Sequence, residues 1–247
     1  AWPSTLLIQP RDFHFPSKSL QTMLSICSTG EKRIKLDFNG LHHHMQLDVE
    51  TSEVFFELRR LGIEKIDLEY SSDYGNAIMM CKFLRPKHIN LSSSVHAICD
   101  FLFESLDVCT ESLNLSNIKL TPDNTRFTSL GGLSSLTKLR CLNLSGLDLV
   151  NDKNLALFQH LPDLTDMDLS NCRNITSYQH LNPNLRKLNL SRCGNVDDPV
   201  GLGNLTKLEY LDMCYCDGIN LEEYGTRTIA HMTRLRVLNL DSNSRIM

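Results

Sequence analysis

The segments Leu139-Arg-Cys-Leu-Asn-Leu-Ser145, Leu164-Thr-Asp-Met-Asp-Leu-Ser170 and Leu185-Arg-Lys-Leu-Asn-Leu-Ser191 are nearly superimposable, and they decide the fold. Two further copies follow, Leu208-Glu-Tyr-Leu-Asp-Met-Cys214 and Leu235-Arg-Val-Leu-Asn-Leu-Asp241. Self-similarity at a period of roughly 20–29 residues predicts a solenoid in which each copy adds one short strand to a parallel ladder. Such a molecule offers a long concave surface rather than a buried catalytic pocket, which favours the binding of a partner.

Weaker copies extend this pattern towards the N-terminus. If the central apolar residue of each strand is its anchor, the spacing between neighbouring anchors runs from 21 to 32 residues. A weaker strand is expected still earlier, at residues 6–8. The nine anchors are Ile34, Ile66, Ile89, Leu113, Leu142, Met167, Leu188, Leu211 and Leu238.

The fold class that follows is α/β: a curved solenoid with the strand ladder on its concave face and helices and loops on its convex face. Long repeats leave room for a convex helix, as over 94–106 and 154–159, whereas the short repeat around Leu188 leaves room only for an extended or 3₁₀ segment. We expect residues 1–29 to form an N-terminal cap or a first irregular repeat. Residues 30–247 should form an array of about nine repeats that is truncated at its C-terminal end.

Charge and hydropathy restrict the class of partner. The formal net charge is −4, the isoelectric point is near 6.1, and no run of Lys and Arg exceeds two residues. A nucleic-acid-binding surface usually shows as a clustered basic excess, so no nucleic acid is expected as a partner. The sequence contains no stretch of 18 apolar residues, so no membrane-spanning segment is expected either.

The cysteines indicate a compartment. There are nine, an odd number, and none of them forms a CxxC zinc pair. Cys172, Cys193 and Cys216 stand at the same place in consecutive repeats, which is a packing position. Buried, reduced thiols are therefore expected, and with them a cytoplasmic or nuclear location.

These cysteine repeats resemble the cysteine-containing subtype of the leucine-rich-repeat superfamily, which reads LxxLxLxxCxxI followed by Thr or Asp. The resemblance covers residues 110–243 well and residues 30–109 loosely. The three matching repeats are Leu164–Cys172 with Ile175-Thr176, Leu185–Cys193 with Val196-Asp197, and Leu208–Cys216 with Ile219-Asn220.

This subtype is common in F-box proteins and in Zyg/Zer-type receptors of ubiquitin ligases. The resemblance implies a protein–protein interaction module, namely the substrate-recognition part of a cullin-RING ubiquitin-ligase receptor. A cullin-RING adaptor would then bind through regions outside this sequence. The alternative is a non-ligase scaffold or regulatory leucine-rich-repeat protein in a signalling or ribonucleoprotein assembly.

Candidate binding residues are those that differ between repeats on the concave face. The fifth position of the motif is Asn or Asp in nearly every copy, so we interpret this column as a repeat feature that is hydrogen-bonded along the ladder. The third and eighth positions vary and carry the residue types that are enriched in interface hot spots. The predicted protein-binding residues, on two adjacent strands, are Arg186, Lys187, Arg192, Tyr210 and Tyr215.

No site for chemistry emerges from the sequence. The motifs GxSxG, HExxH, GxGxxG and the P-loop are absent, so we expect no enzyme and no catalytic residues. Three adjacent histidines, His42-His-His44, have no Cys or acidic ligand at a fixed spacing, and a solvated loop explains them better than a metal site. No cofactor and no metal are therefore expected.

Overall fold

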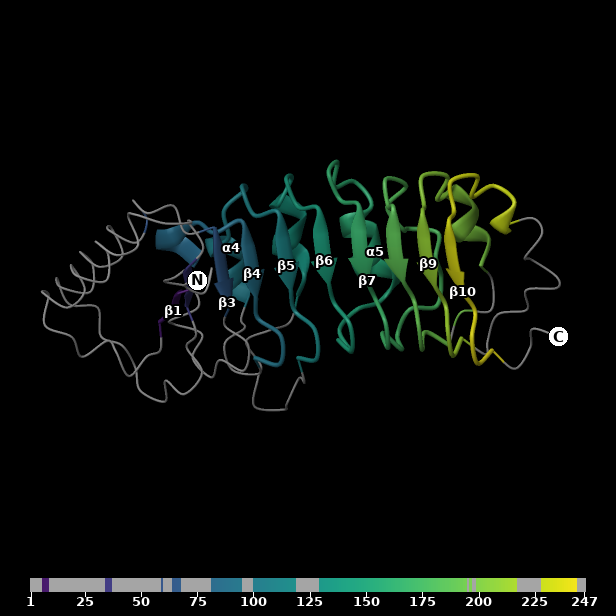
Figure 1. Cartoon of the computed structure of the whole chain (residues 1–247), viewed down its shortest axis with the longest axis horizontal. Helices are drawn as coiled ribbons and strands as arrows, with labels where there is room; N and C mark the ends of the chain where they lie inside the picture. The colour runs from purple at the N-terminus through teal and green to yellow at the C-terminus, as the bar shows by residue number, and fades with distance from the viewer. Residues whose placement is uncertain are drawn as a thin grey trace, which may run out of the picture.

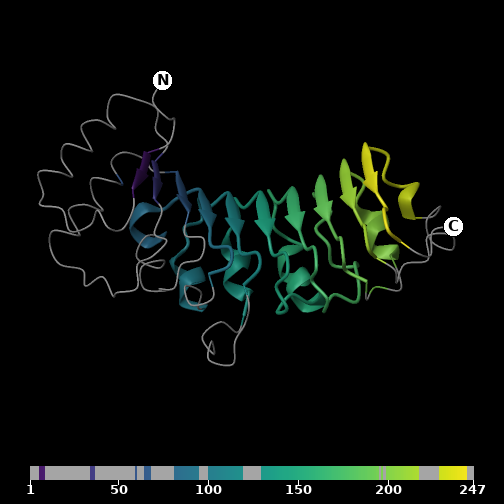
Figure 2. The same ribbon diagram turned by 60° about the horizontal axis from the view of Figure 1, so that its bottom comes forward.

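The computed structural model describes residues 6–8, 34–36, 59, 64–67, 81–94, 100–118, 129–194, 196, 199–216 and 228–243. The strands stand side by side along the length of the molecule (Figure 1). A turned view shows them on one face, with helices and loops on the opposite face (Figure 2). The predicted α/β solenoid, with a parallel ladder on the concave face, is confirmed.

All the described strands are three residues long and pair in parallel. Eight of them form one sheet, and the first two form a separate two-stranded sheet. In chain order they are β1 (Leu6–Ile8), β2 (Ile34–Leu36), β3 (Lys65–Asp67), β4 (His88–Asn90), β5 (Ser112–Asn114), β6 (Cys141–Asn143), β7 (Asp166–Asp168), β8 (Lys187–Asn189), β9 (Tyr210–Asp212) and β10 (Val237–Asn239).

The register of the large sheet follows the predicted anchors. The central residues of neighbouring strands are paired from Ile66 in β3 to Leu238 in β10. Because side chains alternate across a strand, the central residue points into the solenoid while the first and third residues face the concave surface. In β6, for example, Leu142 is buried, whereas Cys141 is exposed and Asn143 is partly exposed.

The first anchor is wrong by one residue. Ile34 is the first residue of β2, and Lys35 is its centre, paired with Leu7 of β1. Ile34 and Leu36 are apolar residues two apart, so alternation places both on the same face of the strand. The ladder of about nine strands is also divided, because β2 lies beside β3 without being hydrogen-bonded to it. This break falls at the longest anchor spacing of the chain.

Convex elements differ between repeats, and the shortest repeat has no helix, as predicted. The described convex elements include the α-helices α4 (Asp100–Ser105) and α5 (Asp152–Phe158) and the 3₁₀ helices η2 (Gly131–Ser135) and η3 (Val200–Asn204). Residues 81–84 are helical as well. Every residue between β7 and β8, the shortest repeat, is described, and none of them is helical. Helix α5 begins where Asn151 accepts the backbone N–H groups of Lys153 and Asn154, while the Asn154 side chain accepts from the Asn151 N–H. This reciprocal cap satisfies donors that a short helix cannot bond internally.

Three leucine-type residues per repeat build a continuous core. In the β8 repeat they are Leu185, Leu188 and Leu190, all fully buried, and the convex-side residues Phe158 and Tyr178 belong to the same buried cluster. Burial of each such side chain contributes roughly 1.5–3 kcal/mol. The core therefore fixes where the concave side chains stand in the repeats of β4 to β9, whereas in β10 the anchor Leu238 is 37% exposed.

Some expectations fall outside the described residues. The three adjacent histidines, His42-His-His44, lie there. Within the described part of the chain, no helix is long and apolar enough to cross a membrane.

Candidate functional site: the concave face of the ladder

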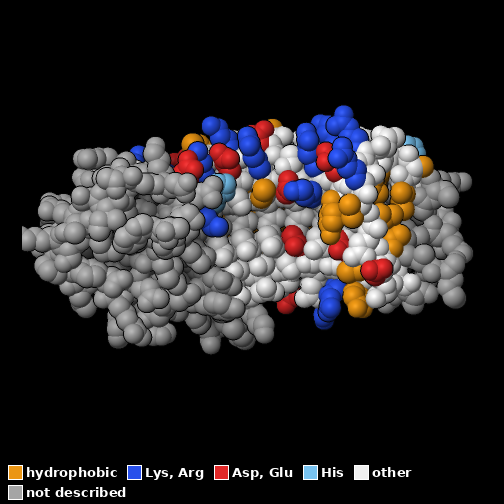
Figure 3. Space-filling view, viewed as in Figure 1, with side chains coloured by type: hydrophobic (Ala, Val, Ile, Leu, Met, Phe, Trp, Pro, Cys, Tyr) orange, Lys and Arg blue, Asp and Glu red, His pale blue; other side chains and the backbone are white. Residues whose placement is uncertain are grey.

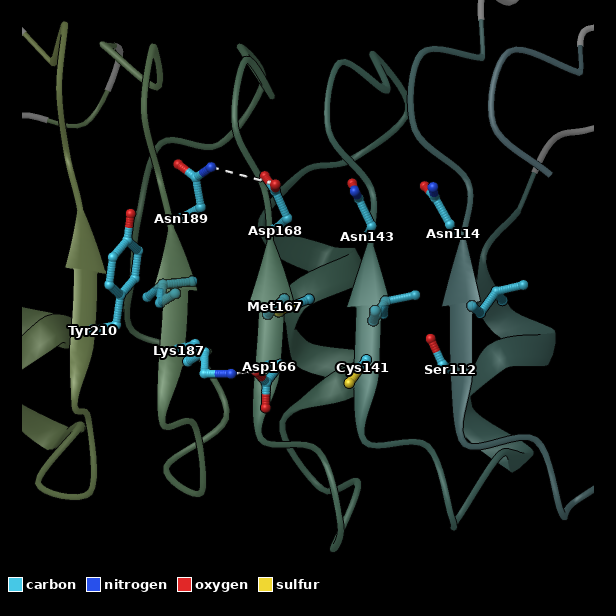
Figure 4. Close-up of a pocket in the computed structure, with 13 residues that line it drawn as sticks. Ser112, Asn114, Cys141, Asn143, Asp166, Met167, Asp168, Lys187, Asn189 and Tyr210 are labelled. Atoms are coloured by element: carbon cyan, nitrogen blue, oxygen red, sulfur yellow. Dashed lines mark hydrogen bonds and ion pairs between the residues drawn. The ribbon is translucent and has the colours of Figure 1, made fainter. Parts of the chain in front are cut away.

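Two rows of outward-facing side chains cover the concave face (Figure 4). One row holds the first residue of each strand and the other holds the third residue. An open groove runs over these rows from β5 to β9. Its floor consists of small polar residues at Ser112, Asn114 and Asn143, and its charged and aromatic side chains are concentrated on β7, β8 and β9.

The row of third residues maintains the repeat. From β4 to β10, each Asn or Asp of this row accepts the backbone N–H two residues later at 2.9–3.1 Å, which closes a turn at the end of the strand. Some members also bond across the ladder: the Asn189 Nδ2 donates to Asp168 Oδ2 at 3.3 Å, and the Asn239 Nδ2 donates to Asp212 Oδ2 at 3.0 Å. This geometry agrees with the interpretation of the column as a repeat feature.

The row of first residues is where the repeats differ. In register order it reads Ser112, Cys141, Asp166, Lys187, Tyr210 and Val237. Lys187 Nζ lies 2.9 Å from Asp166 Oδ1, and the hydrogen bond and charge of Asp166 raise the pKa of Lys187 above its ordinary value. The pair holds the lysine along the floor of the groove between β7 and β8.

Tyr210 stands next to this pair on β9 and is about a third exposed. Its hydroxyl donates to Asp212 Oδ2 at 3.3 Å. Partial burial, then the charge of Asp212 and this hydrogen bond, raises the pKa of Tyr210. Partial burial would also raise the pKa of Asp212, but the hydrogen bonds from Cys214, Asn239 and Tyr210 outweigh it and lower that pKa. At neutral pH the tyrosine is therefore neutral and its acceptor is ionised.

Arg192 and Tyr215 meet at the other end of the strands. The Arg192 guanidinium lies 5.0 Å from the centroid of the Tyr215 ring, within the range of a cation–π contact. Both residues occupy the eighth position of the motif, where the backbone has a positive φ of 61° and 57° respectively. The same position holds Asn117, Gly146 and Asn171 in earlier repeats, which are residue types that adopt this conformation at little cost.

The five predicted residues therefore form two groups rather than one. Lys187 and Tyr210 lie in the groove, with Arg186 beside them at the strand entrance, where its Nη1 is 3.4 Å from Glu209 Oε1. Arg192 and Tyr215 lie beyond the ends of β8 and β9. All five side chains are exposed, and neighbouring strands bring each group together.

Sequence reasoning missed the partners of these residues. Asp166 and Lys187 occupy the same position in consecutive repeats, as do Arg186 and Glu209, so reading the columns across repeats would have found both ion pairs. The positive φ at the eighth position could have been found from the Asn and Gly in earlier repeats. Val237 occupies the third position of the motif, which the repeat pattern already places on the concave face; it lies there and is 48% exposed, although it was not among the predicted binding residues.

The repeat cysteines play no part in the groove. Cys172, Cys193 and Cys216 are buried, and each Sγ donates to a carbonyl oxygen of the preceding repeat at 3.0–3.2 Å. Burial raises the pKa of Cys172 and Cys193 to about 12 and that of Cys216 to about 11. Such thiols are protonated and unreactive at neutral pH, and they pack the turns against one another. Among the described residues, no group of His, Cys, Asp and Glu could hold a metal ion.

Comparison with known proteins relates the chain to others by its fold. The sequence matches no protein-family model and no curated protein sequence. The matched chain of the yeast Rad7 and Elc1 complex has a TM-score of 0.63 and 14% identity over 94% of this chain and 62% of that one. The leucine-rich repeat domain of the type III effector XopL has a TM-score of 0.51 and 17% identity over 96% of this chain and 75% of its own.

An internalin from Listeria monocytogenes has a TM-score of 0.50 and 16% identity over 85% of this chain and 52% of the internalin. This chain thus spans less than two thirds of both the internalin and the matched chain of the Rad7 and Elc1 complex. At these identities the likeness shows the fold, which is that of a leucine-rich-repeat solenoid.

Proposed function

We propose that this solenoid is a protein–protein interaction module that holds its partner on the concave face around β8 and β9. One observation carries the proposal: the ladder keeps a floor of small polar side chains over β5 and β6 and then presents Lys187, Tyr210, Arg192 and Tyr215 on the next strands. Tyr and Arg supply most of the binding energy in many protein interfaces. No catalytic activity is part of this proposal.

The exposed side chains are already partly ordered. Tyr210 is tied to Asp212, Lys187 to Asp166, and Arg192 to Tyr215. Association costs about 0.5–1.5 kcal/mol for each long side chain that it immobilises, so this order lowers the entropic cost of binding.

Within this role, the substrate-recognition part of a cullin-RING ubiquitin-ligase receptor is our first candidate. Its support is the resemblance of residues 164–216 to the cysteine-containing repeats of such receptors. In addition, one matched chain of the same fold forms a complex with another protein, Rad7 with Elc1. A cytoplasmic or nuclear location belongs to this proposal, and the free thiols of the described cysteines agree with it.

The alternative is a scaffold or regulatory protein without a ligase, and the adaptor distinguishes the two. We would express the full-length protein in cells, purify it and measure the cullin and the elongin or Skp adaptor by quantitative mass spectrometry. Enrichment of a cullin and its adaptor supports the receptor. Their absence, with other proteins retained by the concave face, favours the scaffold.

A further inference from the structure

A basic rim borders the concave face where β8, β9 and β10 begin. The segments leading into these strands expose Arg186, Lys207, Arg234 and Arg236. Figure 3 shows Lys and Arg side chains gathered along this edge, above the C-terminal strands. Of the described residues in these three lead-in segments, only Glu209 is acidic. The rim is thus locally positive on a chain whose net charge is −4.

Most of this charge is not neutralised. Glu209 pairs with Arg186, and Lys207 Nζ donates to the neutral Asn184 Oδ1 at 2.7 Å. Arg234 and Arg236 form no ion pair with any carboxylate in the described part of the chain. Cations clustered on one edge of a low-dielectric body focus the field there and attract groups of opposite charge.

An apolar ledge lies directly against the rim. It consists of Tyr210 and Val237, which are register partners on β9 and β10 and face the concave surface with exposures of 36% and 48%. Neighbouring strands are about 4.8 Å apart, so the rim from β8 to β10 spans about 10 Å. That is the length of three extended residues at about 3.3 Å each.

We infer that the rim and the ledge together bind an acidic protein segment with an aliphatic or aromatic anchor residue. The anchor would lie on Tyr210 and Val237, and neighbouring Asp or Glu side chains would pair with Arg234 and Arg236. This inference rests on the proposed function and specifies the partner. Nucleic acid fits the surface less well, because a phosphate backbone that continued past the rim into the groove would meet Asp166, Asp168 and Asp212.

The chain offers a matched control. Lys138 and Arg140 occupy the same motif positions before β6 that Arg234 and Arg236 occupy before β10, and they are exposed as well. The control cations stand four strands away, a distance of about 19 Å, and their ledge position is held by Cys141 instead of Val237. The variants Arg234→Glu/Arg236→Glu and Lys138→Glu/Arg140→Glu therefore make the same change of net charge at two equivalent sites.

The test is a selection of short peptides from an unbiased phage-displayed library on the intact protein. We expect the enriched peptides to carry a net negative charge around an aromatic or aliphatic residue. A fluorescent copy of one such peptide should bind at least about tenfold more weakly to Arg234→Glu/Arg236→Glu, and with nearly unchanged affinity to the control variant. Val237→Ser should weaken it as well, and all variants should melt at the wild-type temperature.

Several results would overturn the inference. They are an absence of enrichment, enrichment of neutral or basic peptides, and equal losses in the rim and control variants. Single-stranded RNA that binds as tightly as the peptide, and loses affinity in the same variant, would identify a general polyanion surface instead. If acidic peptides fail but Tyr210→Ala/Tyr215→Ala still releases a protein partner, only the partner class is wrong. If that variant also has no effect, the proposed function itself fails.

Discussion

The middle of the ladder and its C-terminal part have the same kind of core but carry different side chains on the concave face. Over β5 and β6 the concave face is a floor of Ser, Asn and Cys, whereas over β8 to β10 it carries Lys187, Tyr210 and Val237 beside a basic rim. The anchors Leu142 and Leu188 are both buried in the same register. A solenoid can therefore change its surface one repeat at a time, because the core does not depend on the concave residues.

The largest loss of stability is expected when a charge is placed in the core, and this loss should be equal in both regions. Replacing Leu142 or Leu188 with Asp buries a carboxylate without a partner and should destabilise the array by about 4 kcal/mol or more. Urea unfolding and hydrogen exchange of the adjacent strands measure this loss. Lys187→Asn, one residue away on the exposed face, is the control and should change stability little. A small loss of stability in Leu188→Asp would mean that the central side chain of β8 is not part of the core.

Thiol labelling compares the floor with the core. Cys141 is exposed on the groove floor and Cys109 is exposed elsewhere, whereas Cys172 and Cys193 are fully buried. The exposed pair should react with a maleimide at least about a hundredfold faster, because the buried pair reacts only after local opening that costs several kcal/mol. Mass spectrometry of partly labelled protein gives the rates. Fast labelling of Cys172, or a native disulfide at Cys193, would contradict the packing.

Asn143 and Asn189 occupy the same motif position in their repeats, but Asn143 forms one of these hydrogen bonds and Asn189 forms two. Asn143 accepts the Ser145 N–H, while Asn189 accepts the Ser191 N–H and also donates to Asp168. Asn143→Ala should cost about 1 kcal/mol, and Asn189→Ala should cost measurably more. Urea midpoints of the two variants test this order. Equal losses would show that the bond across the ladder contributes nothing.

The smallest effect on stability is expected at Tyr215. Tyr215→Asn introduces the residue type found at the same left-handed position in Asn171, so stability should stay the same or rise by less than about 1 kcal/mol. Thermal unfolding measures this change, with Asn171→Tyr as the reverse substitution in the neighbouring region. A clear loss of stability in Tyr215→Asn would mean that the ring contact with Arg192 supports the fold rather than a partner.

The sequence predicts the position of a residue well when that position follows from hydrophobic spacing, and poorly when it depends on contacts between repeats. Anchors from Ile66 to Leu238 follow from hydrophobic spacing alone, because core packing admits one register. Ile34 was misplaced because an isolated Ile-x-Leu pattern does not say which residue is central. The ion pair between Arg186 and Glu209 depends on which repeat lies alongside, and spacing within a single repeat does not contain that information.

Partner binding on the concave face around β8 and β9 can be tested by one comparison of affinities. Wild-type protein, Tyr210→Ala/Tyr215→Ala and the middle-region variant Ser112→Ala/Cys141→Ala would be compared for affinity to the same purified partner. The tyrosine variant should lose about 2 kcal/mol, some thirtyfold in Kd, with its melting temperature nearly unchanged. The middle-region variant should bind as the wild type does. Unaltered binding in the tyrosine variant, or an equal loss in both, would contradict the account.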